Sequence, residues 1–139
     1  MARDKYHSLV KQALIDEHWT ITDDPFMEKL SRYRAIARKI ILDLGAQKNK
    51  PDKPIRYQVV ADEETGNYLL VRNGWKGSTR FYNTLVHIEV RSDATVWLHQ
   101  DNTDLVIADM LLDAGIPPKS IVLGFHTPAM RPDTEFAVG

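Results

Sequence analysis

The chain of 139 residues contains no cysteine, which excludes disulfide bonds and thiolate zinc sites. It also has little net charge. Its 18 Lys and Arg and 19 Asp and Glu leave a formal charge of −1, which gives no general attraction to phosphate backbones or anionic membranes. No apolar run approaches the ~20 residues that a membrane span needs, and the first residues lack the pattern of a signal peptide. We therefore expect a soluble cytoplasmic protein.

The apolar fraction of 43% is enough to build the core of one domain, with or without an appendage. Apolar spacing predicts a first helix over residues 3–17 and a short β-prone segment at 19–22. A second helix is predicted over 27–44, with Gly45 as its C-cap and a solvated loop over 47–54. The apolar residues of this helix recur every three or four positions: Leu30, Tyr33, Ile36, Ala37, Ile40, Ile41 and Leu44.

Strands are predicted after the second helix, at 55–62, 68–75, 79–91, 95–100 and 121–123. Gly66 supplies the positive φ that the first hairpin turn needs. A third helix is predicted over 103–114, capped by Thr103 or Asp101, with Leu105 on its buried side. Because consecutive hairpins form a meander, the sequence predicts an α+β fold: an antiparallel meander sheet of four to five strands with helices packed on one face.

The register of the hairpin around Ser92-Asp93-Ala94 can also be predicted. A three-residue loop sets Val90 opposite Val96, Ile88 opposite Leu98 and Val86 opposite Gln100, which gathers the apolar side chains on one face. A slip of one residue would scatter them. The preferred register places His87 opposite His99 and Glu89 opposite Trp97 on the other face of the sheet.

Several segments, in their order along the chain, resemble the XisI family, which is named after an fdxN element excision controlling factor of cyanobacteria. They are Asn73-Gly74-Trp75, the strands at 85–90 and 96–101, the helix and its exit at 103–117, and the C-terminal stretch VLGFHTPAMRPDTEFAVG. The resemblance covers about residues 27–139. Residues 1–26 instead resemble the opening of XisH, the protein that accompanies XisI. The resemblance therefore implies a helix–strand extension over 1–26 and an XisI-like domain over 27–139.

This resemblance implies a non-catalytic accessory factor for the programmed excision of a DNA element. The factor would act by binding an XisH-like partner or the recombination machinery, without a cofactor. Residues 1–26 are either a structural remnant of a shortened upstream gene or a mimic of XisH that occupies the groove where XisH would bind. Both accounts stay open.

A rival, enzymatic hypothesis is a metal-dependent nuclease or hydrolase, because XisH-like proteins resemble restriction-endonuclease-like nucleases. Asp43 and the run Glu89-Val90-Arg91 superficially resemble parts of such a site. However, Arg is a poor replacement for the expected Lys, and the complete Glu-x-Lys strand is missing. His87, His99 and Asp101 form a possible metal set that is short of ligands. We expect no catalytic residue, cofactor or metal site.

Two binding hypotheses remain. The densest basic stretch would serve a direct DNA-binding module: Arg32, Arg34, Arg38, Lys39, Lys48, Lys50 and Lys53. For protein binding, the aromatic residues exceed what a small sheet with two helices needs, and the C-terminal stretch is too apolar to stay frayed, so we expect it to dock. A homodimer is the simplest assembly. The candidate partner-binding residues are Trp75, Trp97, His87, His99, Phe125, His126, Arg131, Glu135 and Phe136.

Overall fold

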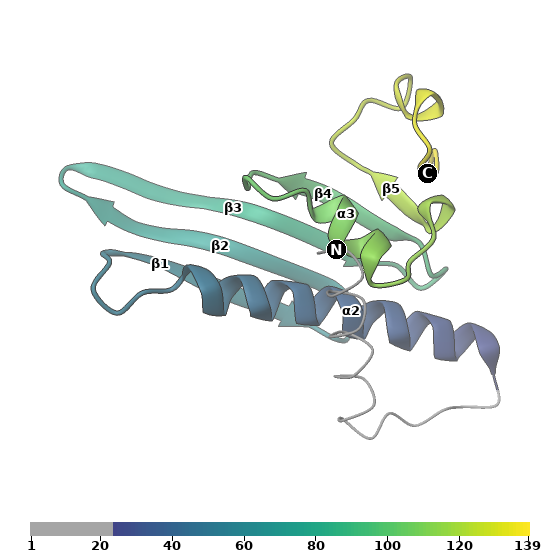
Figure 1. Cartoon of the computed structure of the whole chain (residues 1–139), viewed down its shortest axis with the longest axis horizontal. Helices are drawn as coiled ribbons and strands as arrows, with labels where there is room; N and C mark the ends of the chain where they lie inside the picture. Colours follow the sequence, from purple (N-terminus) through teal and green to yellow (C-terminus); the bar gives the residue numbers. More distant parts are fainter. Residues whose placement is uncertain (1–23) are drawn as a thin grey trace.

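A computed structural model of the chain describes residues 24–139, which form two helices and one five-stranded sheet (Figure 1). The sheet order is that of the sequence, with β1 to β4 antiparallel and β5 parallel to β4. The α+β prediction is confirmed, except that the last strand is not part of the meander. The elements are α2 (Pro25–Lys48), β1 (Ile55–Asp62), β2 (Asn67–Lys76), β3 (Thr79–Val90), β4 (Val96–Asp101), α3 (Ile107–Asp113) and β5 (Ile121–Leu123), with 3-10 turns at Pro118–Ser120 and Arg131–Asp133. The helix and strand predicted over residues 3–22 lie outside the described residues.

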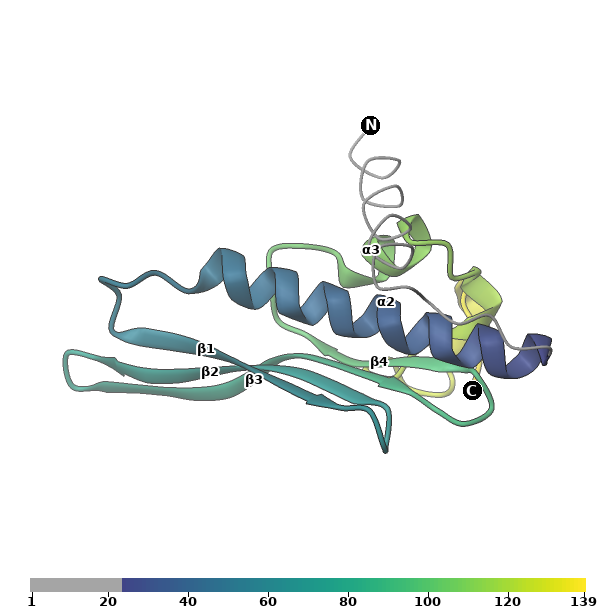
Figure 2. The same cartoon turned by 90° about the horizontal axis from the view of Figure 1, so that it is seen from below.

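Both helices cover the same face of the sheet (Figure 2). The core lies between them and the sheet, because every second strand residue points toward the helices. Its largest fully buried side chains come from both layers: Tyr33, Ile36, Ile40, Ile41 and Leu44 on α2, Tyr68, Leu70, Ile88 and Leu98 on the strands, and Ile107 and Leu111 on α3. The seven apolar positions predicted for α2 are all buried.

Helix α2 is longer than predicted at both ends. At its start, the Asp24 carboxylate accepts the backbone N–H of Phe26 at 3.0 Å and of Met27 at 3.4 Å, and Pro25 needs no such partner. At its end, the Asn49 backbone and side chain both donate to the Gly45 carbonyl. These caps satisfy the terminal backbone groups and move each boundary outward.

The prediction that Gly45 caps the helix is wrong, because Gly45 lies within α2 and is buried. A Cβ atom at this position would come within 2.7 Å of Val59 Cγ2 and 3.7 Å of Leu70 Cδ1. Gly45 therefore allows the helix to approach β1 and β2 closely. This packing role could not be recognised in the sequence, where a glycine after an apolar helical pattern resembles a helix end.

The predicted register of β3 and β4 is confirmed at Val90–Val96 and Ile88–Leu98 and fails beyond them. Val86 faces Asp101, and His87 faces Gln100, because His99 is an extra residue at a β-bulge. The bulge shifts the pairing by one residue. Asp101 is thereby brought to the end of β4, where its carboxylate accepts the N–H of Ile107 at 2.9 Å and caps α3 from a distance.

Helix α3 begins four residues later than predicted, at Ile107. The residues before it form an irregular turn, in which Thr103 Oγ1 donates to Asp101 and accepts the N–H of Leu105. Leu105 is 41% exposed, so its predicted burial is wrong. Between residues 24 and 139, no helix has the length and apolarity that crossing a membrane would require.

The hairpin of β2 and β3 extends well past β4 (Figure 1). Strand β3 pairs with β4 only from Val86 onward, whereas its pairing with β2 continues to Thr79 opposite Lys76. Strand β1 joins this projection, since Ile55 faces Gly74. We call residues 55–58 and 71–84 the arm.

Candidate functional site

The sheet face opposite the helices is the main candidate surface, and we call it the open face. Tyr68 and Leu70 are buried against the helices, so the alternate β2 residues Leu69, Val71 and Trp75 point to the other side. No helix between residues 24 and 139 covers this side (Figure 2). Pairing extends the open face to Val60, Tyr82, His87, Glu89, Trp97 and Arg80 on the neighbouring strands.

His87 and His99 are neighbours on the open face, as predicted, although they are not directly paired. Their ring centroids lie 4.8 Å apart at an angle of 46°. The bulge at His99 explains how the rings meet despite the register shift. His87 Nε2 lies 2.9 Å from Asn67 Oδ1, and His99 Nε2 lies 2.8 Å from Glu89 Oε1.

The charges around this pair are mutually satisfied. Burial acts to raise the pKa of Glu89, but hydrogen bonds from His99 and from Arg91 at 3.2 Å outweigh it and hold that pKa below its ordinary value. Burial, reinforced by the nearby His99, lowers the pKa of His87. The two histidines thus belong to a polar cluster in which the His87 imidazole favours its neutral form and the Glu89 carboxylate is held by His99 and Arg91.

The geometry does not assemble the nuclease or metal sets considered from the sequence. Asp43 lies on α2 and pairs with Lys39 at 3.2 Å, on the other side of the sheet from Glu89. The Asp101 carboxylate is turned to Thr103 and Ile107. Within residues 24–139, no three His, Asp or Glu side chains are placed to share a metal ion.

Trp97 joins the open face to the C-terminal segment. The Arg91 guanidinium lies 3.9 Å from the centre of its ring, and the Arg131 guanidinium lies 5.3 Å from it. His99 stacks nearby, with ring centroids 5.7 Å apart. A Cβ atom at Gly139 would come within 3.1 Å of Trp97 Cη2. The chain's own C-terminal residues therefore cover this corner of the open face.

The C-terminal segment docks on its own domain, which confirms the expectation that it is not frayed. Ala137 N–H donates to the Ile121 carbonyl at 2.8 Å and extends the sheet beyond β5, while Phe136 packs against the core. Arg131, a candidate partner-binding residue, instead donates to the backbone carbonyls of His126 and Val138 of its own chain.

The remaining tail residues are less enclosed. Glu135 is exposed, and Phe125 is 50% exposed with its ring edge-on to His126, centroids 4.8 Å apart. His126 Nδ1 is buried and has no hydrogen-bond partner among residues 24–139. These three residues lie beside the docked segment, but nothing in their geometry singles out a ligand.

Trp75 lies apart from the other candidates, near the end of the arm. It faces Arg80, and Glu89 lies nine positions after Arg80 on β3, a span of roughly 30 Å. Trp75 is 54% exposed and Tyr82 66% exposed, and the Arg80 guanidinium lies 5.5 Å and 5.2 Å from their ring centres. Arg80 was not expected from the sequence, and neither was Val60, which is 46% exposed on the edge strand β1 of the open face. Strand alternation was the signal that could have found both.

Comparisons with known proteins agree with this architecture. A family model described as XisI protein matches residues 27–138. A crystal structure of a XisI-like protein from Anabaena variabilis ATCC 29413 is 29% identical, with a TM-score of 0.73, over 79% of this chain and 99% of that one. Another, of the fdxN element excision controlling factor XisI from the same organism, is 33% identical, with a TM-score of 0.70, over 80% and 99%. None of the proteins with curated descriptions matches the chain.

The family match begins at Met27, so the comparisons give no support to the predicted XisH-like segment at residues 1–26. From Met27 onward the match covers most of the chain and includes the sheet, both helices and the docked C-terminal segment. The chain belongs to the XisI family.

Proposed function

We propose that this protein controls the excision of a DNA element as a non-catalytic accessory factor, and that it does so by binding another protein through its open face. Membership of a family that includes an fdxN element excision controlling factor supports the excision role. An XisH-like protein or the recombination machinery is the proposed partner. We place this activity in the cytoplasm, with the DNA.

The observation that carries the proposal is the one-sided packing of the sheet. Helices cover one face, while the other exposes Val60, Trp75 and Tyr82. Aromatic residues with few rotatable bonds suit an interface, because they bury a large area at a small cost in conformational entropy. The Arg80 guanidinium, which lies over the rings of Trp75 and Tyr82, adds hydrogen-bond donors at the same surface.

The test is co-purification of an XisH-like protein expressed together with this chain, compared between two variants. Val60→Glu places a charge on the open face, on its edge strand β1, where Val60 is 46% exposed. Leu42→Glu places one on the outer side of α2, where Leu42 is 40% exposed. We expect Val60→Glu to lose the partner and to reduce excision in a reporter strain, while Leu42→Glu retains both. Equal retention by both variants would contradict binding through the open face.

The non-catalytic part is tested separately with supercoiled plasmid and Mg²⁺ or Mn²⁺. We expect no cleavage, because Asp43 and Glu89 lie on opposite sides of the sheet and each is engaged by a neighbouring cation. Cleavage that disappears in Asp43→Ala or Glu89→Ala would show that the protein is a nuclease.

A further inference from the structure

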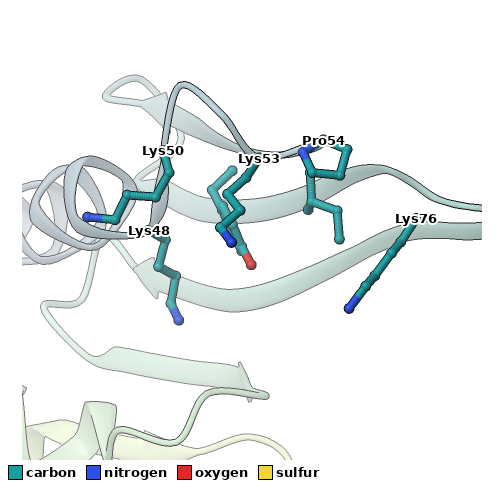
Figure 3. A pocket seen from close by; sticks show the side chains of 7 residues that line it. Lys48, Lys50, Lys53, Pro54 and Lys76 are labelled. Atoms are coloured by element: carbon teal, nitrogen blue, oxygen red, sulfur yellow. The ribbon is translucent and has the colours of Figure 1, made fainter.

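A second, separate site lies on the helix side of the sheet, where α2 ends next to the arm. A pocket of about 310 Å³ is lined there by Lys48 at the end of α2, Lys50 and Lys53 in the following loop, and Lys76 at the end of β2. Pro54, Ile55 and Tyr57 form its apolar walls. Figure 3 shows Lys48, Lys53 and Lys76 pointing to the same side, while Lys50 turns away.

The charge of this region differs from that of the whole chain. The loop and arm segments 47–58 and 71–84 contain seven Lys and Arg and a single acidic residue, Asp52, although the protein as a whole carries −1. Among residues 24–139, none of the four pocket lysines pairs with a carboxylate, and no carboxylate lines the pocket. Ammonium groups that point to the same side of one pocket without a counter-ion repel one another, so a bound anion would stabilise them.

The residue types are compatible with a phosphate. Lys acts as a mobile point charge on a flexible stem and binds phosphates without demanding one geometry. The pocket contains lysines and no arginine. Tyr57 keeps one wall rigid, since Lys48 Nζ lies 5.7 Å from its ring centre and Asn49 holds its backbone at both N–H and C=O.

We propose that this pocket binds the phosphate backbone of DNA through Lys48, Lys53 and Lys76. Such a contact is independent of base sequence. Because the positive charge is concentrated at one end of the molecule, it would attract the DNA backbone although the net charge of the whole protein is −1. It goes beyond the proposed protein-binding function and uses the opposite side of the sheet. The two sites together would let the protein hold DNA and a protein partner at once.

The experiment measures binding of the full chain to a short fluorescent DNA duplex of mixed sequence over a series of salt concentrations. The variant Lys53→Gln/Lys76→Gln is compared with Lys29→Gln/Arg32→Gln, which removes the same charge at the far end of α2, roughly 24 Å from Lys48 by helix geometry. We expect the pocket variant to bind at least about tenfold more weakly at low salt and its salt slope to fall by roughly two, while the control matches the wild type.

Three results would overturn the proposal. One is the absence of DNA binding by the wild type at low salt. Another is an equal loss in the two variants, which would indicate diffuse electrostatics. The third is displacement of the DNA by polyglutamate as effective as that by unlabelled DNA, which would assign the pocket to an acidic protein segment. Circular dichroism spectra that match the wild type exclude misfolding, and loss of DNA binding with the XisH-like partner retained separates this site from the open face.

Discussion

The surroundings of the His87 side chain change its pKa. Its ring lies against that of His99, and its Nε2 bonds to Asn67, so part of it is removed from water on a sheet face that is otherwise open. Burial and the neighbouring His99 both disfavour a positive charge there, whereas Glu89 favours it to a lesser degree. The net effect lowers the pKa of His87, which makes the stability of the protein sensitive to acid.

We predict that acidification destabilises the wild type more than the variant His87→Gln. With the pKa of His87 below its ordinary value of 6.5, the unfolded chain binds this proton more readily than the folded one. The contribution of neutral His87 is therefore fully present above pH 6.5 and is lost as the pH falls toward the lowered pKa. Melting temperatures across this range check the prediction, and parallel curves for the two proteins would contradict it. Gln keeps a group that can bond Asn67, so the comparison isolates the titration.

Gly45 is a single residue that decides how closely α2 packs on the sheet. We predict that Gly45→Ala destabilises the protein by about 1 kcal/mol, because overpacking costs roughly 1–3 kcal/mol and the gain in helix propensity recovers only about 0.5–1. The added methyl group would meet Val59 Cγ2, which cannot turn away easily since Val is stiff in a strand. Urea denaturation measures the difference.

The double variant Gly45→Ala/Val59→Ala is the control for this mechanism. Removing the Val59 methyl groups should make the Gly45→Ala change neutral or favourable in the second background. A Gly45→Ala protein more stable than the wild type would show that helix and sheet move apart at little cost.

At the scale of elements, the sequence predicted that the C-terminal segment docks, but it did not predict the surface on which the segment docks. We predict that deleting residues 132–139 lowers the melting temperature, since it removes Phe136 from the core, the Ala137 bond to β5 and the cover over Trp97. Full burial of one Phe contributes roughly 1.5–3 kcal/mol, and Phe136 is only partly buried, so the lower end applies.

Two point variants separate the causes of this loss. Phe136→Ala should reproduce most of the destabilisation, whereas Glu135→Ala, at an exposed neighbouring position, should leave the melting temperature unchanged. If the deletion itself melts like the wild type, the segment contributes nothing to the fold.

The elements also show where local patterns stop being informative. The bounds of β1 matched the prediction, and those of β2 to β5 matched within a few residues, because hairpin turns and strand alternation depend on neighbouring residues in the sequence. The start of α3 did not, since Asp101 caps it across five intervening residues. The β-bulge at His99 could not be predicted either, because an extra residue in one strand does not change the local sequence pattern in a recognisable way.

At the scale of the whole molecule, the open face makes self-association a competitor of partner binding. We predict that light scattering at micromolar concentration gives a mass near twice 15.9 kDa and that Val60→Glu shifts it to the monomer without unfolding. Trp97, one of the partner-binding residues expected from the sequence, is a poor probe because its ring already contacts Arg91 and Arg131. Leu42→Glu is the matched control and should remain dimeric. A wild-type mass near 15.9 kDa would rule out the homodimer.

Among the described residues, the sequence by itself determined the fold class, the order of the elements and the buried side of α2, because hydrophobic periodicity is a local property that burial must obey. Only the tertiary structure decided which distant side chains meet. Lys76 joins Lys48 and Lys53 in one pocket, Gly139 covers Trp97, and Gly45 touches Val59. Such neighbours depend on register, bulges and the closeness of two layers, and these are set by packing across the whole domain rather than by any one segment.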